Sequence, residues 1–177
     1  MDVKKNRQSW LTTGLQVLAN QGAEGLRVMP IAKMLGVTKG SFYWHFKNLE
    51  AFQVSLLEEW ESCYTQQAIE CVENLGGDYK TKLNNLFIGS ATTDFTLARS
   101  IRSWSLTNQS VREVQARVDQ QRLDYLEQLL QGVGWSLADA TVLARWSYCA
   151  FIGYATLEGP TVSVQQLNLV LGILVPR

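Results

Sequence analysis

Residues 28–47 read VMPIAKMLGVTKGSFYWHFK, a pattern typical of two short helices joined by a tight turn. Ile31, Leu35 and Phe42 would face one another across such a pair and form its apolar contact. Gly36 falls where the chain must turn sharply, and glycine tolerates the positive φ needed there better than other residues do. The segment is therefore predicted to be a helix-turn-helix.

The second helix of this motif begins with small and basic residues and continues into an aromatic run. Thr38 can cap the helix, and recognition helices of this kind enter the major groove of DNA by their N-terminal end. The four aromatic residues 43–46 cannot all face inward on one helix, so some must be exposed. A Tyr hydroxyl and a His imidazole beside Lys39 and Lys47 suit phosphate contacts. The alternative, a helix pair used only for packing, does not explain this run.

The segment from Lys5 to Ala51, which includes LGVTKGSFYWHFKN at 35–48, resembles the tetracycline-repressor-like (TetR) transcriptional regulators. The resemblance implies an N-terminal three-helix DNA-binding domain followed by a divergent helical domain that binds a ligand and dimerises. It places the division between residues 1–47 and residues 48–177. Beyond about residue 60 the resemblance extends only to the order and lengths of the helices.

The resemblance also assigns roles within the motif. The start of the second helix would read bases, Tyr43 and His45 would hold phosphates, and Lys47 matches a basic residue before the next helix. Two positions depart from the family pattern: Leu49 replaces a common Lys, and Arg27 replaces a Thr or Ser cap and could contact phosphate itself. The residues predicted to contact DNA are Arg27, Thr38, Lys39, Gly40, Ser41, Tyr43, Trp44, His45 and Lys47.

Charge is unevenly divided along a chain whose formal net charge is zero. Residues 1–50 hold seven Lys/Arg against three Asp/Glu, whereas residues 51–177 hold nine against thirteen. A basic head on an acidic body indicates a polyanion partner for the head only. His45 is the single histidine, and the sequence has no nucleophile motif, phosphate loop or metal-ligand spacing. We therefore expect no enzymatic activity, no cofactor and no metal.

No stretch alternates with a period of two between turn signals, so we expect an all-α protein. Asn48 and Ser136 are expected to cap helices, and Gly159-Pro160 to end one. The three cysteines suit reduced, buried thiols of a cytosolic protein that has no secretion signal and no membrane partner. The expected helices cover residues 5–19, 28–35, 39–46, 49–74, 79–92, 94–106, 109–131, 136–157 and 162–174.

Aromatic residues of the body allow an apolar effector pocket among the middle helices, although each taken alone also suits core packing. The helices expected to surround this pocket carry Trp60, Tyr64, Phe87, Trp104 and Trp146. Such a lining would favour a largely apolar small molecule whose identity the sequence does not give. A ligand there could tilt the long helix that begins after Asn48 and so change DNA binding.

The penultimate helix is apolar on two sides, because between 136 and 157 only Asp139 and Arg145 are charged. One side can meet its own core and the other a second subunit; the alternative is a central helix of a monomer. In the family the last two helices of each protomer form a four-helix dimer interface. The residues predicted for this seam are Ala144, Tyr148, Phe151, Ile152, Ala155, Leu167, Val170 and Leu171.

Together these features predict a transcriptional regulator, specifically a repressor released from its operator by a small-molecule effector. A homodimer would bind double-stranded DNA that carries an inverted repeat. Two alternatives remain open. One is a DNA-bound structural factor of the same fold that acts through a protein partner. The other is a helical small-molecule-binding protein that has lost its DNA contacts.

Overall fold

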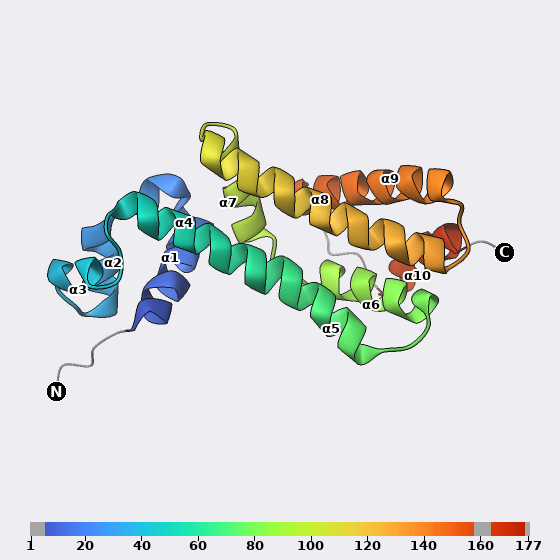
Figure 1. The fold of residues 1–177 in the computed structure, drawn as a ribbon, viewed down its shortest axis with the longest axis horizontal. Helices are drawn as coiled ribbons and strands as arrows, with labels where there is room; N and C mark the ends of the chain where they lie inside the picture. The colour runs from blue at the N-terminus through green and yellow to red at the C-terminus, as the bar shows by residue number, and fades with distance from the viewer. Residues whose placement is uncertain (1–5, 158–163, 176–177) are drawn as a thin grey trace. The chain divides into compact units, whose positions relative to one another are not determined.

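The computed structural model describes residues 6–157 and 164–175, and every regular element within them is helical (Figure 1). The all-α prediction is confirmed. The predicted first residue of the first helix, Gly159-Pro160 and the predicted start of the last helix lie outside the described residues. The helices are α1 Arg7–Gln21, α2 Val28–Leu35, α3 Lys39–Tyr43, α4 Leu49–Glu61, α5 Gln67–Leu75, α6 Tyr79–Ala91, α7 Thr96–Ser105, α8 Gln109–Gly132, α9 Leu137–Thr156 and α10 Val164–Leu174.

Side-chain caps fix where several helices begin. Asn48 accepts a hydrogen bond from the Ala51 N–H at 2.8 Å, and Ser136 accepts one from the Asp139 N–H at 3.2 Å. These two predicted caps are therefore confirmed, whereas Thr38, also predicted as a cap, occupies the N-cap position of α3 without a side-chain hydrogen bond to the helix. Asn6 caps α1 in the same way as Asn48, through the Ser9 N–H at 2.9 Å. Such caps stabilise a helix by about 1 kcal/mol each.

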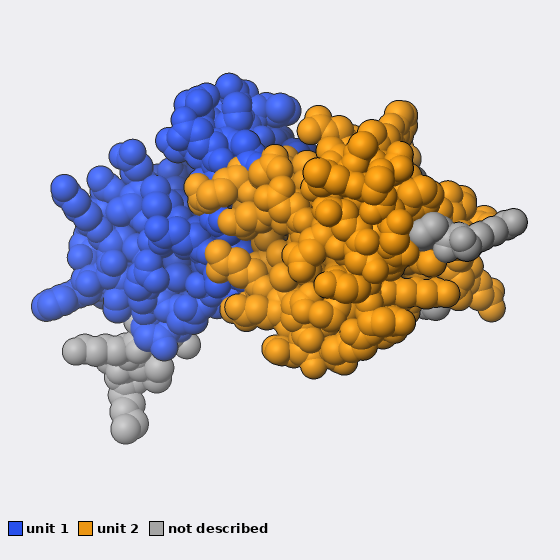
Figure 2. Space-filling model, turned by 45° about the vertical axis from the view of Figure 1, so that its right-hand side comes forward, with its two compact units in different colours: residues 1–64, 96–116 blue, residues 65–95, 117–177 orange. Residues whose placement is uncertain are grey.

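The chain divides into two compact units (Figure 2). The first holds the described residues up to Tyr64 together with Thr96–Ala116, and the second holds Thr65–Phe95 with the described residues from Arg117 onward. Helix α7 therefore belongs with the helix-turn-helix, where it packs on α1 and the Ser100 hydroxyl donates to the Ala19 carbonyl at 3.2 Å. The functional division at residue 47 stays a prediction, since compactness does not test it.

The first unit is built on a cluster of buried aromatic rings contributed by α1, α3, the following turn and α4. The Phe42 ring lies 5.3 Å from that of Trp10 and 5.5 Å from that of Phe52, both edge to face. Helix α3 ends at Tyr43, three residues before the predicted end. The Phe46 ring nevertheless points inward, 4.9 Å from that of Phe52, as its position four residues after the buried Phe42 leads one to expect.

Close packing between α1 and α4 depends on Gly14. A Cβ added at this position would lie 2.5 Å from Phe52 Cζ and 2.8 Å from Leu56 Cδ2. Both neighbours are fully buried, so neither has space to move away. The helix that follows the DNA-binding motif is thereby locked against the first helix.

A turn of π-helix at Ser62–Gln66 separates α4 from α5, where one uninterrupted helix was predicted. Thr65 of this turn is buried and its hydroxyl accepts a hydrogen bond from Arg122 Nε at 3.1 Å. The same region of the second unit holds Tyr148, whose hydroxyl donates to Asp119 at 2.7 Å.

The core of the second unit is largely aliphatic, with Tyr125 of α8 as a buried aromatic member, and is formed by α5, α6, α8, α9 and α10. Leu83, Leu129 and Leu130 are fully buried at its centre, beside Ala140 of α9. The Trp135 indole N–H donates to the Leu174 carbonyl at 2.7 Å and so fastens the end of α10. No helix among the described residues has the length and apolar character needed to cross a membrane.

The expectation of buried thiols is wrong for two of the three cysteines. All three are free, but Cys71 and Cys149 are exposed and only Cys63 is half-buried. Burial and the neighbouring Glu59 carboxylate raise the pKa of the Cys63 thiol. Cys149 is exposed because it lies on the side of α9 that faces away from the core, together with Val142 and Trp146.

Candidate nucleic-acid interface

The turn of the helix-turn-helix has the predicted backbone. Gly36 adopts the left-handed conformation, with φ 68° and ψ 31°. Its N–H donates to the Lys33 carbonyl at 3.1 Å, and the Val37 N–H donates to the Ala32 carbonyl at 3.0 Å. A side chain would be strained at this φ, so glycine permits the sharp approach of α3 to α2.

Helix α3 presents its first turn outward while one residue holds it to the core. Thr38 occupies the N-cap position with extended backbone, and Lys39 and Gly40 are exposed. Ser41 is half-buried, and Phe42 has no exposed surface. The recognition surface is therefore small, rigidly supported and free of bulky apolar groups at its start.

The aromatic run divides as the sequence predicted, with some rings inside and others outside. Trp44 is 88% exposed and Tyr43 is 51% exposed, whereas Phe46 is buried. His45 is half-buried. The Lys39 ammonium lies over the Tyr43 ring at 5.9 Å from its centroid, which groups a cation and a phenol hydroxyl on one surface.

Two further cations flank the recognition helix. Lys47 is exposed directly before the Asn48 cap. Arg27 is exposed at the N-cap position of α2, where its Nε donates to the Glu24 carbonyl at 3.1 Å. The predicted DNA contacts thus lie on one short stretch of the first unit. Their roles stay predictions, since no nucleic acid is present.

The sequence did not point to Arg7 at the start of α1. One of its terminal guanidinium nitrogens donates to the Ser55 hydroxyl at 2.8 Å, and the guanidinium carbon lies 5.5 Å from the centre of the Phe46 ring. Arg7 therefore ties α1 to α4 and to the turn after α3. A lone basic residue near a chain start gives no signal of such a contact.

The five residues predicted for an effector pocket are divided between the two units. Trp60 and Trp104 are buried in the first unit, which also holds the exposed Tyr64. Phe87 is half-buried in the second unit, where Trp146 is 74% exposed. These residues do not form one lining within either unit, and their role as a pocket stays a prediction.

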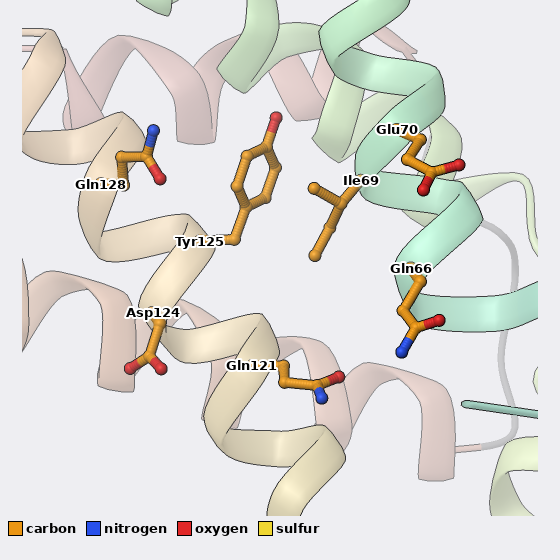
Figure 3. Close-up of a pocket in the computed structure, with 7 residues that line it drawn as sticks. All are labelled: Gln66, Ile69, Glu70, Gln121, Asp124, Tyr125 and Gln128. Atoms are coloured by element: carbon orange, nitrogen blue, oxygen red, sulfur yellow. The ribbon is translucent and has the colours of Figure 1, made fainter. Parts of the chain in front are cut away.

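The second unit contains a groove between α5 and α8 that the sequence analysis did not identify. Its volume is about 450 Å³, and none of the five predicted pocket residues lines it. The α8 residues that line the groove follow helical spacing. In the sequence, polar residues at this spacing indicate an ordinary solvated helix face, and for this reason the groove was not predicted. The lining residues are Gln66, Ile69, Glu70, Gln121, Asp124, Tyr125 and Gln128 (Figure 3).

The predicted dimer seam mostly faces the protomer's own core. Ala144 and Leu171 are 2% and 8% exposed and belong to the aliphatic core of the second unit. Ala155 and Leu167 are buried as well, and Tyr148, Phe151 and Ile152 are half-buried; of the eight, only Val170 is exposed. Within the single chain the small residues of this face therefore serve internal packing, and the seam residues stay a prediction.

Exposed apolar side chains lie on the opposite face of α9 and on α10. They are Val142 and Trp146 of α9, Leu157 directly after it, and Leu169, Val170 and Ile173 of α10. We call these six residues the apolar stripe. Monomeric proteins rarely leave such a patch exposed unless it meets a partner.

Comparison with known proteins gives a family match for part of the first unit. Residues 11–52 match the sequence profile of the family described as bacterial regulatory proteins, tetR family. The HTH-type transcriptional repressor NemR of Escherichia coli strain K12 is 34% identical over 77 residues, which is 44% of this chain and 39% of NemR. The HTH-type transcriptional regulator AcrR of Shigella flexneri is 30% identical over 87 residues, 49% of this chain and 40% of AcrR.

The chain therefore aligns with about two fifths of the length of these curated relatives. Similarity of structure extends further than similarity of sequence. The crystal structure of a TetR transcriptional regulator from Legionella pneumophila superposes with a TM-score of 0.76 and covers 98% of this chain and 97% of that chain, at 16% identity. At this identity the match shows a shared fold for both units.

Proposed function

We propose that the chain is a transcriptional repressor of the tetR family of bacterial regulatory proteins, whose sequence profile residues 11–52 match. A homodimer would bind an inverted-repeat operator in double-stranded DNA and be released from it by a small molecule. The observation that carries the proposal is the α2–α3 motif. Its recognition helix is fixed by the buried Phe42 and exposes Lys39, Tyr43 and Trp44.

Within the motif, we assign base reading to Lys39 and phosphate contact to Tyr43, His45 and Lys47. An exposed ammonium at the start of the helix can reach guanine O6 and N7 in the major groove. Hydroxyl, imidazole and ammonium groups farther along the chain suit phosphate oxygens, which position the protein without reading sequence. The basic character of this part of the chain supports the assignment.

The dimer is supported by the apolar stripe of α9 and α10. A second copy of the chain would cover Trp146 and its neighbours with the same residues of its own, as a two-fold interface requires. Two recognition helices would then meet successive major grooves, about 34–36 Å apart along the duplex. The operator is accordingly expected to be an inverted repeat.

Release by an effector rests on the continuity of the chain. Helix α4 packs against α1 in the first unit and leads through the π turn into α5 of the second unit. A ligand that favours one arrangement of α5 needs a coupling free energy of about 1–3 kcal/mol to change operator affinity roughly 5- to 150-fold. Ligand and operator must then weaken each other's binding by the same factor.

The proposal is tested by mixing the purified protein with fragments of its own genome and sequencing those it retains. Recovery of a shared inverted repeat upstream of genes is the expected result. Retention of many unrelated fragments would favour the structural-factor alternative. Failure to retain any fragment at low salt would contradict both and leave a small-molecule-binding protein.

A further inference from the structure

We propose that the groove between α5 and α8 is a binding site for a small organic dication, a molecule with two positively charged ends joined by an apolar segment. The inference deepens the proposed function, because it names the chemical class of the effector. The groove differs in character from the apolar pocket that the aromatic composition predicted. Its chemistry follows from which side chains line it and from how they are held.

The floor and the walls of the groove have different chemistry (Figure 3). The Tyr125 ring from α8 and the Ile69 side chain from α5 point toward each other and provide apolar surface. Glu70 is contributed by α5 and Asp124 by α8, so the two carboxylates stand on opposite helices. None of the seven lining residues is cationic.

Both carboxylates are available to a ligand. Glu70 and Asp124 are exposed, and among the described contacts Asp124 accepts a hydrogen bond only from the Gln120 amide, at 2.7 Å. A carboxylate has about four lone-pair positions, so this bond leaves most of its capacity unused. Gln66, Gln121 and Gln128 also line the groove, and their side-chain amide oxygens can accept further hydrogen bonds.

The aromatic wall is held in place rather than mobile. The Tyr125 hydroxyl donates to Glu73 Oε1 at 2.8 Å, and Glu73 forms an ion pair with Lys82. These two partners lower the pKa of Glu73, while burial and the Glu73 carboxylate raise the pKa of Tyr125. The Tyr125 side chain is thereby fixed in place with only 7% of the residue exposed, so it offers the groove an apolar edge rather than an open ring face.

These features select a ligand with two charges. A monocation would satisfy one carboxylate and leave the other without a partner, and a neutral molecule would leave both. An apolar segment between two ammonium groups would instead lie along Tyr125 and Ile69. The groove volume of about 450 Å³ lies within the range of roughly 300–1,000 Å³ that is usual for small-molecule sites.

The test uses hexamethylenediamine as the probe, with hexylamine and hexanediol as matched comparisons that carry one charge and none. Isothermal titration calorimetry on the full chain without DNA measures each affinity. We expect the diamine to bind about tenfold or more tightly than hexylamine, since charge-assisted contacts are the stronger ones. Glu70→Gln and Asp124→Asn should each reduce diamine affinity to near that of hexylamine. The control is Glu58→Gln, at an exposed position of α4 outside the groove, which should leave diamine affinity unchanged.

Equal affinities for the diamine and hexanediol, or diamine binding unaffected by Glu70→Gln and Asp124→Asn, would overturn the site. Operator affinity is measured separately, with and without the diamine. The variant that carries both Glu70→Gln and Asp124→Asn shows how much of any change comes from diamine that binds the DNA instead of the protein. Diamine binding without weaker operator affinity would retain the site and reject it as the effector site. Operator binding without diamine binding would retain the repressor and reject the site.

Discussion

Replacing Trp146 by alanine is expected to dissociate the proposed homodimer without unfolding the protomer. The indole is 74% exposed in the single chain, so its removal leaves no cavity in the core. Trp146 lies in the apolar stripe, and in the proposed two-fold dimer Trp146 of the second copy would lie in the same interface. The substitution therefore removes two large side chains from each interface.

The size of the effect follows from the exposed area. An indole side chain presents about 200 Å², so the exposed three quarters of Trp146 amounts to about 150 Å² in each protomer. Covering that area stabilises the dimer by at most about 4 kcal/mol per side chain at 25 cal/mol per Å². Large interface side chains commonly contribute about 2 kcal/mol or more each. Two copies at that value raise the dimer dissociation constant about 1,000-fold.

Sedimentation equilibrium across a concentration series measures this constant, and circular dichroism confirms that the variant is folded. Trp44→Ala is the matched control, because Trp44 is equally large, even more exposed and belongs to the other compact unit. It should leave the dimer intact and weaken only DNA binding. A Trp146→Ala protein that dimerises as tightly as the wild type would refute the assignment of the apolar stripe to the seam.

Three further predictions concern the first unit and one ion pair of the second. Lys39→Ala should relax base preference at one position of each half-site, whereas Lys47→Ala should weaken binding to all sequences and reduce the slope of log affinity against log salt concentration by about one. Fluorescence anisotropy titrations of labelled operator at several salt concentrations distinguish the two effects. An unchanged base preference in Lys39→Ala would contradict the placement of this residue in the major groove. Gly14→Ala should destabilise the protein by about 1–3 kcal/mol, visible as a lower Tm, because its Cβ would meet Phe52 Cζ at 2.5 Å. The folded-state pKa of Glu73 lies below its ordinary value, so its contribution to stability is present above that ordinary value and is lost as pH falls through the folded-state pKa. Glu73→Gln should flatten the Tm profile over that acidic range, and an identical profile would argue against the ion pair.

Local signals in the sequence predicted the helix-turn-helix because its geometry depends on neighbours in the chain. The positive φ of Gly36, the burial of Phe42 and the cap at Asn48 each follow from residues a few positions apart. Helix α3 ends at Tyr43 while Phe46 packs against Phe52, a residue of the next helix, and no local signal marks that end.

The two faces of α9 show where such reasoning stops. Periodicity identified both faces as apolar, but it does not say which one meets the protomer's own core. Ala144 joins the core beside Leu129, while Trp146, two residues later, remains exposed. The groove was missed for a similar reason, because Glu70 and Asp124 on separate helices have the pattern of solvated surface until tertiary structure brings them together.

The chain connects the groove to the helix-turn-helix through two stretches of helix. A ligand held by Glu70 and Asp124 joins α5 to α8, and both helices continue along the chain into the first unit. Helix α5 follows from α4, which is locked against α1 at Gly14. Helix α8 begins in the first unit. There Arg112 Nε donates to the Ser105 carbonyl at 3.2 Å and holds the end of α7, which packs on α1. Both stretches of chain lead to α1, which packs on α2 of the helix-turn-helix, and we therefore expect a ligand that changes how α5 meets α8 to alter operator binding through them.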